Sequence, residues 1–245
     1  MVGNAAPELL IVAPTKRELV GLDTKRASNI RVEVAGLGEK AGLRLSNLVA
    51  TERPRIVLSL GFAGALSSTL CTGDLLVCKA YHLYPGMKPD VDDAESPIIA
   101  ADERLTDTIT PALQTIGSRS TRGDILTTRT PILGSHDKYI LGADTGCLAA
   151  DMEGWWMAQA VAHPGVRLVS LRAVLDETVL NLPAFVTNIV ADDGRREIMH
   201  VIRGLRRVDT WRSFWPLLTR SRIACKALRE ATAALIPSLL KAPQA

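Results

Sequence analysis

Short, continuously apolar runs recur along the first three quarters of the chain. Such runs are typical of β-strands that are covered on both faces. The clearest are Leu9–Ala13, Arg55–Leu60, Leu75–Cys78 and Arg167–Ala173. Two further segments, Ile30–Ala35 and Arg122–Thr127, alternate apolar and polar residues in part and also predict strands.

Segments with helical periodicity lie between these strands. They are Lys40–Ala50, Asp102–Thr115 and Glu153–Ala162. Strands that alternate with helices favour an α/β domain with a mixed or mostly parallel sheet. We assign this domain to residues 1–190, where no repeat or low-complexity linker interrupts the pattern.

The last quarter of the chain has no strand signal. Asp192–Arg206 and Trp211–Leu240 have helical patterns, and the prolines predict a break at Pro216 and an end near Pro237. We therefore expect residues 191–245 to form a helical C-terminal extension that packs on or near the α/β domain.

Composition excludes several classes of protein. The chain has 245 residues, of which 47% are hydrophobic and 22% charged, with a net charge of +3, so it is not disordered. Its four cysteines form no C-x-x-C pair, which argues against a disulfide framework and a zinc site. We expect no metal and no cofactor. The first residues lack the basic start of a signal peptide, and Ile56–Leu66 is too short to cross a bilayer, so we expect a cytoplasmic protein.

The positive charge is concentrated in one segment. Residues 195–229 hold ten basic and two acidic residues, interleaved with Trp211, Phe214, Trp215, Leu217 and Leu218. Basic helices with such apolar residues are typical of segments that lie on anionic lipid, so one interpretation is peripheral contact with the inner membrane surface. The other is a helical hairpin that packs on the domain or on a second subunit. Nucleic acid is disfavoured, because no nucleic-acid-binding motif accompanies the patch.

Two glycine motifs follow predicted strands. Gly36-Leu-Gly38-Glu-Lys-Ala-Gly42 has one residue too many for the dinucleotide fingerprint, so a tight strand-to-helix turn is favoured. Gly61-Phe-Ala-Gly64 comes directly after the Arg55–Leu60 strand. We expect it to be a loop at the carboxyl end of the strand, where backbone N–H groups approach a ligand closely.

Acidic residues mark the ends of two predicted elements. Asp151 and Glu153 lie where a strand gives way to a helix, and Asp176 ends the strand that begins at Arg167. A carboxylate at the end of a buried strand must be paired or must face a cleft. Helix capping explains these acids as well as catalysis does, and spacing alone does not separate Asp151 from Glu153.

Five motifs in this order resemble the purine nucleoside phosphorylase/uridine phosphorylase superfamily. They are Gly36-Leu-Gly38-Glu-Lys-Ala, Ile56-Val-Leu-Ser-Leu-Gly-Phe-Ala-Gly-Ala-Leu66, Gly73-Asp74-Leu-Leu-Val, Asp151-Met-Glu153 and Leu171-Arg-Ala-Val-Leu-Asp176. The branch with methylthioadenosine/S-adenosylhomocysteine nucleosidase and futalosine hydrolase is the most similar. The resemblance implies a three-layer fold, in which helices flank a central mixed sheet, with a C-terminal helical appendage.

The resemblance also implies roles for individual residues. Asp176 matches the acid that protonates the leaving purine at N7. Glu153 matches the carboxylate that holds the ribose hydroxyls, with Met152 against the sugar, and this match selects Glu153 over Asp151. Glu18 is a candidate to orient or deprotonate water, although an exposed acid at a helix start is an equal alternative. The implied substrate-binding positions further include Gly61, Phe62, Ala63, Gly64, Pro131 and Ile132.

The chain departs from the nucleosidase pattern at its pocket positions. Phe62 and Leu175 stand where the methylthioadenosine enzyme has serines, and Pro131-Ile132 falls near its base-stacking Phe-Ile pair. These changes suit a nucleoside with a bulky lipid on its 5′ carbon. The phosphate ligands of the phosphorylases are missing, since residues 13–18 read APTKRE, so water is the expected nucleophile.

A narrower resemblance covers the whole chain. Leu182-Pro183, Asp193-Gly194-Arg195 and the basic tail resemble the hopanoid-biosynthesis-associated members, which implies release of adenine from adenosylhopane to leave ribosylhopane. The alternatives are a methylthioadenosine/S-adenosylhomocysteine-type nucleosidase, a nucleoside phosphorylase, and a non-catalytic nucleoside- or lipid-binding module. The family resemblance also implies a homodimer.

Overall fold

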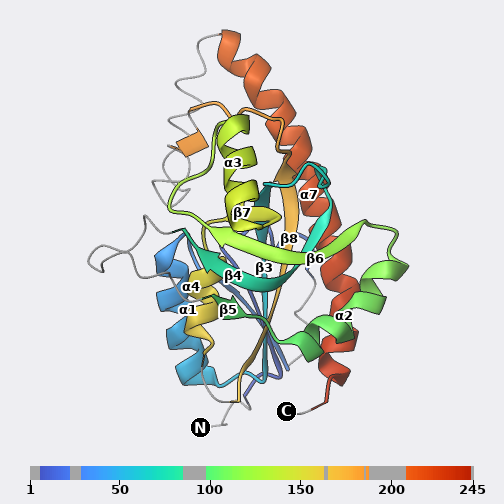
Figure 1. Ribbon diagram of the computed structural model, residues 1–245. Coiled ribbons are helices and arrows are strands. Elements are labelled where there is room, and N and C mark those ends of the chain that lie inside the picture. The colour runs from blue at the N-terminus through green and yellow to red at the C-terminus, as the bar shows by residue number, and fades with distance from the viewer. Residues whose placement is uncertain are drawn as a thin grey trace, which may run out of the picture.

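A computed structural model describes residues 6–22, 29–84, 98–162, 165–184, 186–187 and 208–243. One mixed sheet of eight strands lies between two layers of helices (Figure 1). The strands are β1 (Leu9–Ala13), β2 (Ile30–Val34), β3 (Ile56–Ala65), β4 (Leu75–Leu83), β5 (Ile99–Ala100), β6 (Ser120–Thr127), β7 (Ala149–Asp151) and β8 (Arg167–Asp176).

The sheet closes on itself in its central part. The main path runs β2-β1-β3-β7-β6-β4-β5, and β8 pairs with both β3 and β4. The strands β3, β8, β4, β6 and β7 therefore form a hydrogen-bonded ring. Strands β1 and β8 run parallel to β3, whereas β7 is antiparallel to β3 and β4 is antiparallel to β8. In the β3–β8 pair, Gly61 lies opposite Arg172 and Gly64 opposite Asp176.

Helices cover both faces of the sheet. Helices α1 (Glu39–Glu52) and α4 (Gly154–Ala160) pack on one face, and α2 (Glu103–Thr115) and α7 (Val208–Lys241) pack on the other (Figure 1). Strand β1 shows why its sequence is continuously apolar: Leu10 and Val12 face the first helical layer, and Leu9 and Ile11 face the second. The predicted three-layer α/β fold is confirmed.

The C-terminal helix α7 is continuous over Val208–Lys241, so the predicted break at Pro216 and end near Pro237 are wrong. Proline weakens a helix interior by about 3 kcal/mol. Burial of the apolar face of α7 against the sheet offsets that cost, since Leu228, Leu235 and Leu239 are completely buried. The guanidinium of Arg55 also donates to the last carbonyls of the helix, at 2.6 Å from the oxygen of Ala242.

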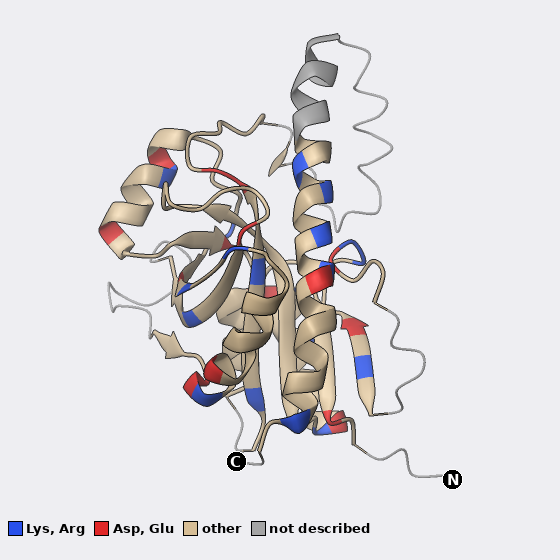
Figure 2. Cartoon of the chain, turned by 90° about the vertical axis from the view of Figure 1, so that its right-hand side faces the viewer, with Lys and Arg blue, Asp and Glu red and all other residues tan. Residues whose placement is uncertain are grey.

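The outward side of α7 is basic. Arg222, Lys226 and Arg229 are exposed along the described part of the helix (Figure 2). The predicted domain boundary at residue 190 and the predicted helix Asp192–Arg206 lie outside the described residues. No helix in the described ranges is long and apolar enough to cross a membrane.

Three elements were not predicted: β5, helix α3 (Ser135–Thr145) and the short strand β7, although the sequence did place the end of a strand before Glu153. Strand β3 is also longer than expected. It continues to Ala65, so Gly61-Phe-Ala-Gly64 is not a loop but part of the strand. Glycine within a strand allows close approach of other groups. Here those groups are the side chains of Arg172 and Asp176.

Candidate functional site

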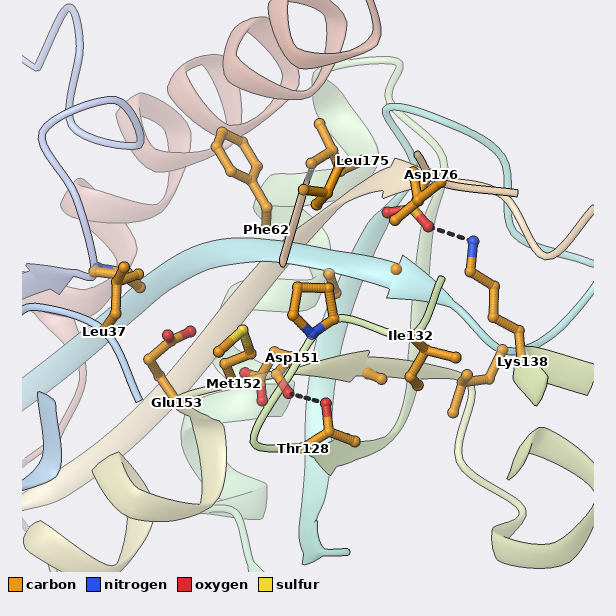
Figure 3. Close-up of a pocket in the computed structure, with 18 of the residues that line it drawn as sticks. Leu37, Phe62, Thr128, Ile132, Lys138, Asp151, Met152, Glu153, Leu175 and Asp176 are labelled. Atoms are coloured by element: carbon orange, nitrogen blue, oxygen red, sulfur yellow. Dashed lines mark hydrogen bonds and ion pairs between the residues drawn. The ribbon is translucent and has the colours of Figure 1, made fainter. Parts of the chain in front are cut away.

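A cavity of about 220 Å³ opens at the carboxyl end of β3 and β8 (Figure 3). Its walls come from these strands, the β7–α4 junction, helix α3 and the segment after β1. The lining residues are Pro14, Glu18, Leu37, Phe62, Ala63, Gly64, Leu66, Thr128, Pro131, Ile132, Lys138, Ala150, Asp151, Met152, Glu153, Leu175, Asp176, Leu182 and Val186. The cavity thus brings together every predicted site residue except Gly61, which lies against Arg172 below it.

Glu153 stands at the start of helix α4, where it is almost completely buried. Its Oε1 accepts a hydrogen bond from the backbone N–H of Gly38 at 2.9 Å. Gly38 has a φ of 60°, a conformation that glycine adopts without strain. The first glycine motif is therefore a turn, as expected, and its N–H holds Glu153. Burial, and secondarily the charge of Asp151, raise the pKa of Glu153 to about 8.

Asp151 is buried, and both of its carboxylate oxygens have partners within the protein. Its Oδ2 is 2.8 Å from Nε of Arg172, in an ion pair in which neither side chain is more than 1% exposed. The hydroxyl of Thr127 donates to its Oδ1 at 2.9 Å, and the backbone N–H of Gly154 donates at 3.0 Å. These contacts separate the two acids that sequence spacing could not. Asp151 supports the β7–α4 junction, whereas no side chain in the described part of the chain pairs with Glu153.

Arg172 lies behind the cavity, and one of its guanidinium nitrogens makes no hydrogen bond with a described residue. Its Nη1 donates to the carbonyl and hydroxyl oxygens of Ser59, both at 3.1 Å. Its Nη2 is buried and has no hydrogen-bond partner among the residues that the structure describes. The charge of Arg172 lowers the pKa values of Glu18 and Glu153, although burial of each acid has the larger, opposite effect. Sequence analysis noted the motif around Arg172 but assigned no role to this residue.

Glu18 belongs to a turn after β1, and its side chain is buried in the cavity wall. Its Oε2 accepts hydrogen bonds from the backbone N–H of Thr15, at 3.1 Å, and from the Thr15 hydroxyl. The alternative of an exposed acid at a helix start is therefore wrong. Burial raises the pKa of Glu18 above its usual value. A buried carboxyl of this kind can accept a proton from water.

Asp176 ends β8 on the opposite side of the cavity from Glu153 (Figure 3). Its Oδ2 is 2.6 Å from Nζ of Lys138, which reaches it from helix α3. Burial raises the pKa of Asp176, while the ammonium of Lys138 acts in the opposite direction. Lys138 was missed by sequence reasoning, because nothing local in the sequence of α3 marks its single lysine as buried.

The remaining wall of the cavity is apolar. Phe62 and Leu175 extend from the neighbouring strands β3 and β8 and lie close together (Figure 3). Leu37, Ile132, Leu182 and Val186 complete this surface. Two acids at opposite sides and an apolar wall between them suit a ligand with polar groups at both ends and an apolar substituent.

A family model described as "Phosphorylase superfamily" matches residues 31–203. The chain belongs to this superfamily, which confirms the resemblance inferred from the five motifs. No curated protein sequence matches the chain significantly.

Solved nucleosidase structures share the fold. The 5′-methylthioadenosine/S-adenosylhomocysteine nucleosidase of Neisseria meningitidis, in complex with methylthio-immucillin-A, superposes with a TM-score of 0.68 at 14% identity, covering 94% of this chain and 98% of that chain. Futalosine hydrolase of Helicobacter pylori gives a TM-score of 0.59 at 20% identity, covering 70% of this chain and 88% of that chain. At these identities the likeness establishes the fold alone.

Proposed function

We propose that this protein is a nucleosidase that cleaves the N-glycosidic bond of an adenosine derivative. The observation that carries the proposal is the placement of Glu153 and Asp176 on opposite sides of one cavity, with Met152 between them (Figure 3). The family resemblance assigns the first acid to the ribose and the second to the base. The geometry is compatible with a nucleoside that spans the cavity from one acid to the other.

Each acid has a separate task in the proposed reaction. The carboxylate of Glu153 accepts hydrogen bonds from the ribose hydroxyls and stabilises the positive charge that develops on the sugar. Asp176 donates a proton or a strong hydrogen bond to N7, so that the purine leaves as a neutral base. Burial favours this role, because it raises the pKa of Asp176.

Water is the proposed nucleophile. Glu18 and Glu153 both line the cavity, and the charge of Glu18 contributes to the raised pKa of Glu153. An ionised Glu18 repels a phosphate dianion and can accept a proton from water.

The apolar wall favours a large apolar substituent on the 5′ carbon. Phe62 and Leu175 replace the polar residues of the methylthioadenosine enzyme, and both pack against the hydrophobic core. Adenosylhopane, which the narrower resemblance implies, combines an adenosine with such a substituent. Methylthioadenosine and S-adenosylhomocysteine, the substrates named for several solved relatives, are the alternatives.

An adenine-release assay tests the proposal. The substrates are a series of 5′-alkyl adenosines of increasing length, including adenosylhopane, with methylthioadenosine and S-adenosylhomocysteine for comparison. We expect release without phosphate and a kcat/KM that increases with the length of the alkyl group. Asp176→Asn and Glu18→Gln should each lower kcat by about 10²–10⁴-fold with the fold retained. Release that requires phosphate would make the protein a phosphorylase, and no release from any adenosine would exclude the proposal.

We further propose that the protein docks on anionic lipid through its C-terminal helix. Arg222 and Lys226 are exposed on α7, and neither has an ion pair with a described residue shorter than the 3.9 Å between Lys226 and Glu230. In sequence, basic residues continue through residues 195–212. Positive charge on an exposed helix complements an anionic bilayer surface, where a lipid-linked nucleoside would be found.

A homodimer is the proposed assembly. Exposed apolar side chains occur on and beside helix α3, where Tyr139 is 68% and Val179 is 79% exposed. Lys138 on the same helix donates to the carbonyl of Leu180, so these side chains belong to one region near the cavity. Apolar patches of this kind mark protein contacts. Light scattering should give a dimer mass that falls to that of a monomer in Tyr139→Glu.

A further inference from the structure

Lys138 is the one cationic side chain among the described residues that line the cavity. It is only 1% exposed, so burial of its ammonium requires charge compensation and hydrogen bonds. The compensating charge is Asp176, the acid that the proposed function assigns to the leaving base. The carboxylate of the adjacent Glu177 is directed elsewhere, since it accepts hydrogen bonds from Thr72, so among the described residues Asp176 alone supplies the counter-charge.

All three N–H groups of this ammonium have acceptors. Nζ lies 2.6 Å from Oδ2 of Asp176, 2.8 Å from the carbonyl oxygen of Leu180 and 3.2 Å from that of Glu177. An ammonium has three donors and no acceptor. Lys138 therefore has no N–H left for a ligand, and it can influence a substrate only through the groups that it holds.

The other carboxylate oxygen of Asp176 remains available. No described residue donates a hydrogen bond to Oδ1, and Asp176 lines the cavity. With Oδ2 fixed by Lys138, the carboxyl plane cannot turn freely about its side-chain bond. Oδ1 is then the oxygen that a bound purine base meets.

We propose that Lys138 is a positioning residue for the cleavage reaction: by holding Oδ2 of Asp176, it directs Oδ1 towards the leaving base. The inference rests on the proposed nucleosidase function. It adds a residue from helix α3 that acts on the substrate only through Asp176. It also explains why the segment after β8, which lines the cavity with Leu182, is tied to the same ammonium through its carbonyls.

The pair also predicts a pH effect. The charged groups that face Asp176 are Lys138 from α3, Arg220 from α7 and the adjacent Glu177. Lys138 is the first of these and lowers the pKa of Asp176, opposing the effect of burial. If Asp176 must donate to N7, activity falls as the pH rises through its pKa. Removing Lys138 should move this alkaline limit to higher pH.

The experiment compares Lys138→Met, Lys138→Arg and, as a matched control, Lys79→Met, which removes an exposed lysine from β4. In Lys138→Met we expect kcat for adenine release to fall about tenfold or more, KM to change by less than about threefold, and the alkaline limit to move up by about one pH unit. Lys138→Arg keeps a cation and should restore the limit and part of the rate. The proposal would be overturned if kcat fell only in proportion to the fraction of folded protein and the alkaline pH limit did not move. Lys138 would then have a purely structural role.

A second readout does not depend on turnover. In ¹³C NMR, the carboxyl resonance of Asp176, assigned with Asp176→Asn, should titrate at higher pH in Lys138→Met than in wild type or Lys79→Met. An unchanged titration would refute control of Asp176 by Lys138, whatever the reaction is. A shifted titration in a protein that releases no adenine would support the coupling and refute the nucleosidase. If Lys138→Met fails to fold, Lys138→Gln, which also removes the charge, serves both measurements.

Discussion

Gly64 of strand β3 lies directly opposite Asp176 of strand β8, and a Cβ atom on Gly64 would be 3.1 Å from Oδ2 of that carboxylate. The glycine leaves the space in which Asp176 reaches both the cavity and Lys138. Gly61, three residues earlier in β3, has the same relationship to Arg172, since a Cβ atom there would be 3.1 Å from Nε. The two glycines therefore allow the roles of two buried side chains to be tested separately.

Alanine at these two glycines should have different effects. In Gly64→Ala the new methyl group displaces the carboxyl of Asp176, so kcat for adenine release should fall about tenfold or more, with a modest loss of stability. In Gly61→Ala the methyl group presses on Arg172, which should lower the free energy of unfolding by about 1–3 kcal/mol. Steady-state kinetics and urea unfolding of both variants check the prediction. Equal effects on rate and stability in the two variants would contradict it.

The ion pair between Asp151 and Arg172 should be a major contributor to stability. Asp151→Asn leaves a buried guanidinium without its counter-charge, which should lower the free energy of unfolding by about 3–5 kcal/mol. The control is Asp107→Asn, which breaks an ion pair with Arg122 in which the aspartate is 62% exposed. That change should have an effect of about 1 kcal/mol or less. Comparable losses in the two variants, measured by urea unfolding, would show that the buried pair is unimportant.

The binding of nucleosides should tighten as the pH rises through about 8. Burial and the charge of Asp151 raise the pKa of Glu153 to about 8, opposed by the N–H of Gly38 and the charge of Arg172. The proton must leave before the carboxylate can accept two hydrogen bonds from the ribose. Calorimetric titration with a 5′-alkyl adenosine should therefore give a lower Kd at pH 9 than at pH 6. In Glu153→Gln, binding should be weak at both pH values, and a Kd independent of pH in wild type would contradict the role of Glu153.

The same shift has a consequence for stability. Between the usual glutamate pKa of about 4.5 and the raised value of about 8, Glu153 is protonated in the folded protein and ionised in the unfolded chain. Its contribution to stability is therefore lost as the pH rises through this window, with a slope of at most about 1.4 kcal/mol per pH unit. Glu153→Gln should flatten the dependence of the unfolding free energy on pH over the same range. An identical pH dependence in the two proteins would argue against a raised pKa.

Lipid docking predicts binding that depends on charge. The protein should sediment with vesicles that contain phosphatidylglycerol and not with pure phosphatidylcholine, and high salt should release it. Arg222→Glu combined with Lys226→Glu on α7 should abolish the binding. The matched control reverses two exposed charges elsewhere, Arg44 on α1 and Arg104 on α2, and should bind as wild type. Binding that survives the α7 substitutions would place the contact in another part of the chain.

Six of the eight strands could be predicted from the sequence because apolar runs are local signals, whereas the candidate acids were selected by the family motifs and not by spacing. Strands such as β1 are apolar at every position, since both faces are covered, and the five motifs are contiguous. The extent of β3 was misjudged, because Gly61 and Gly64 are turn residues by local criteria. Only the register with β8 shows that they make room for Arg172 and Asp176.

The contacts that define the site were beyond local reasoning. Gly38 and Glu153 are 115 residues apart, and Lys138 and Asp176 are 38 residues apart. Each contact exists because different elements end at the same edge of the sheet. Sequence periodicity does not show which residues of distant elements will be in contact. A buried lysine in particular has no pattern that distinguishes it from the exposed lysines typical of helices.

The anchoring of α7 also has a consequence for synthesis of the protein. The layer of the core under α2 and α7 contains residues from β1, near the start of the chain, together with Leu235 and Leu239 near its end. The guanidinium of Arg55, just before β3, donates to the carbonyl oxygens of Leu239, Leu240 and Ala242. This layer therefore cannot close until residue 242 has left the ribosome. The apolar strands made first must remain uncovered throughout translation, so the nascent chain is a natural client for chaperones that shield exposed strands.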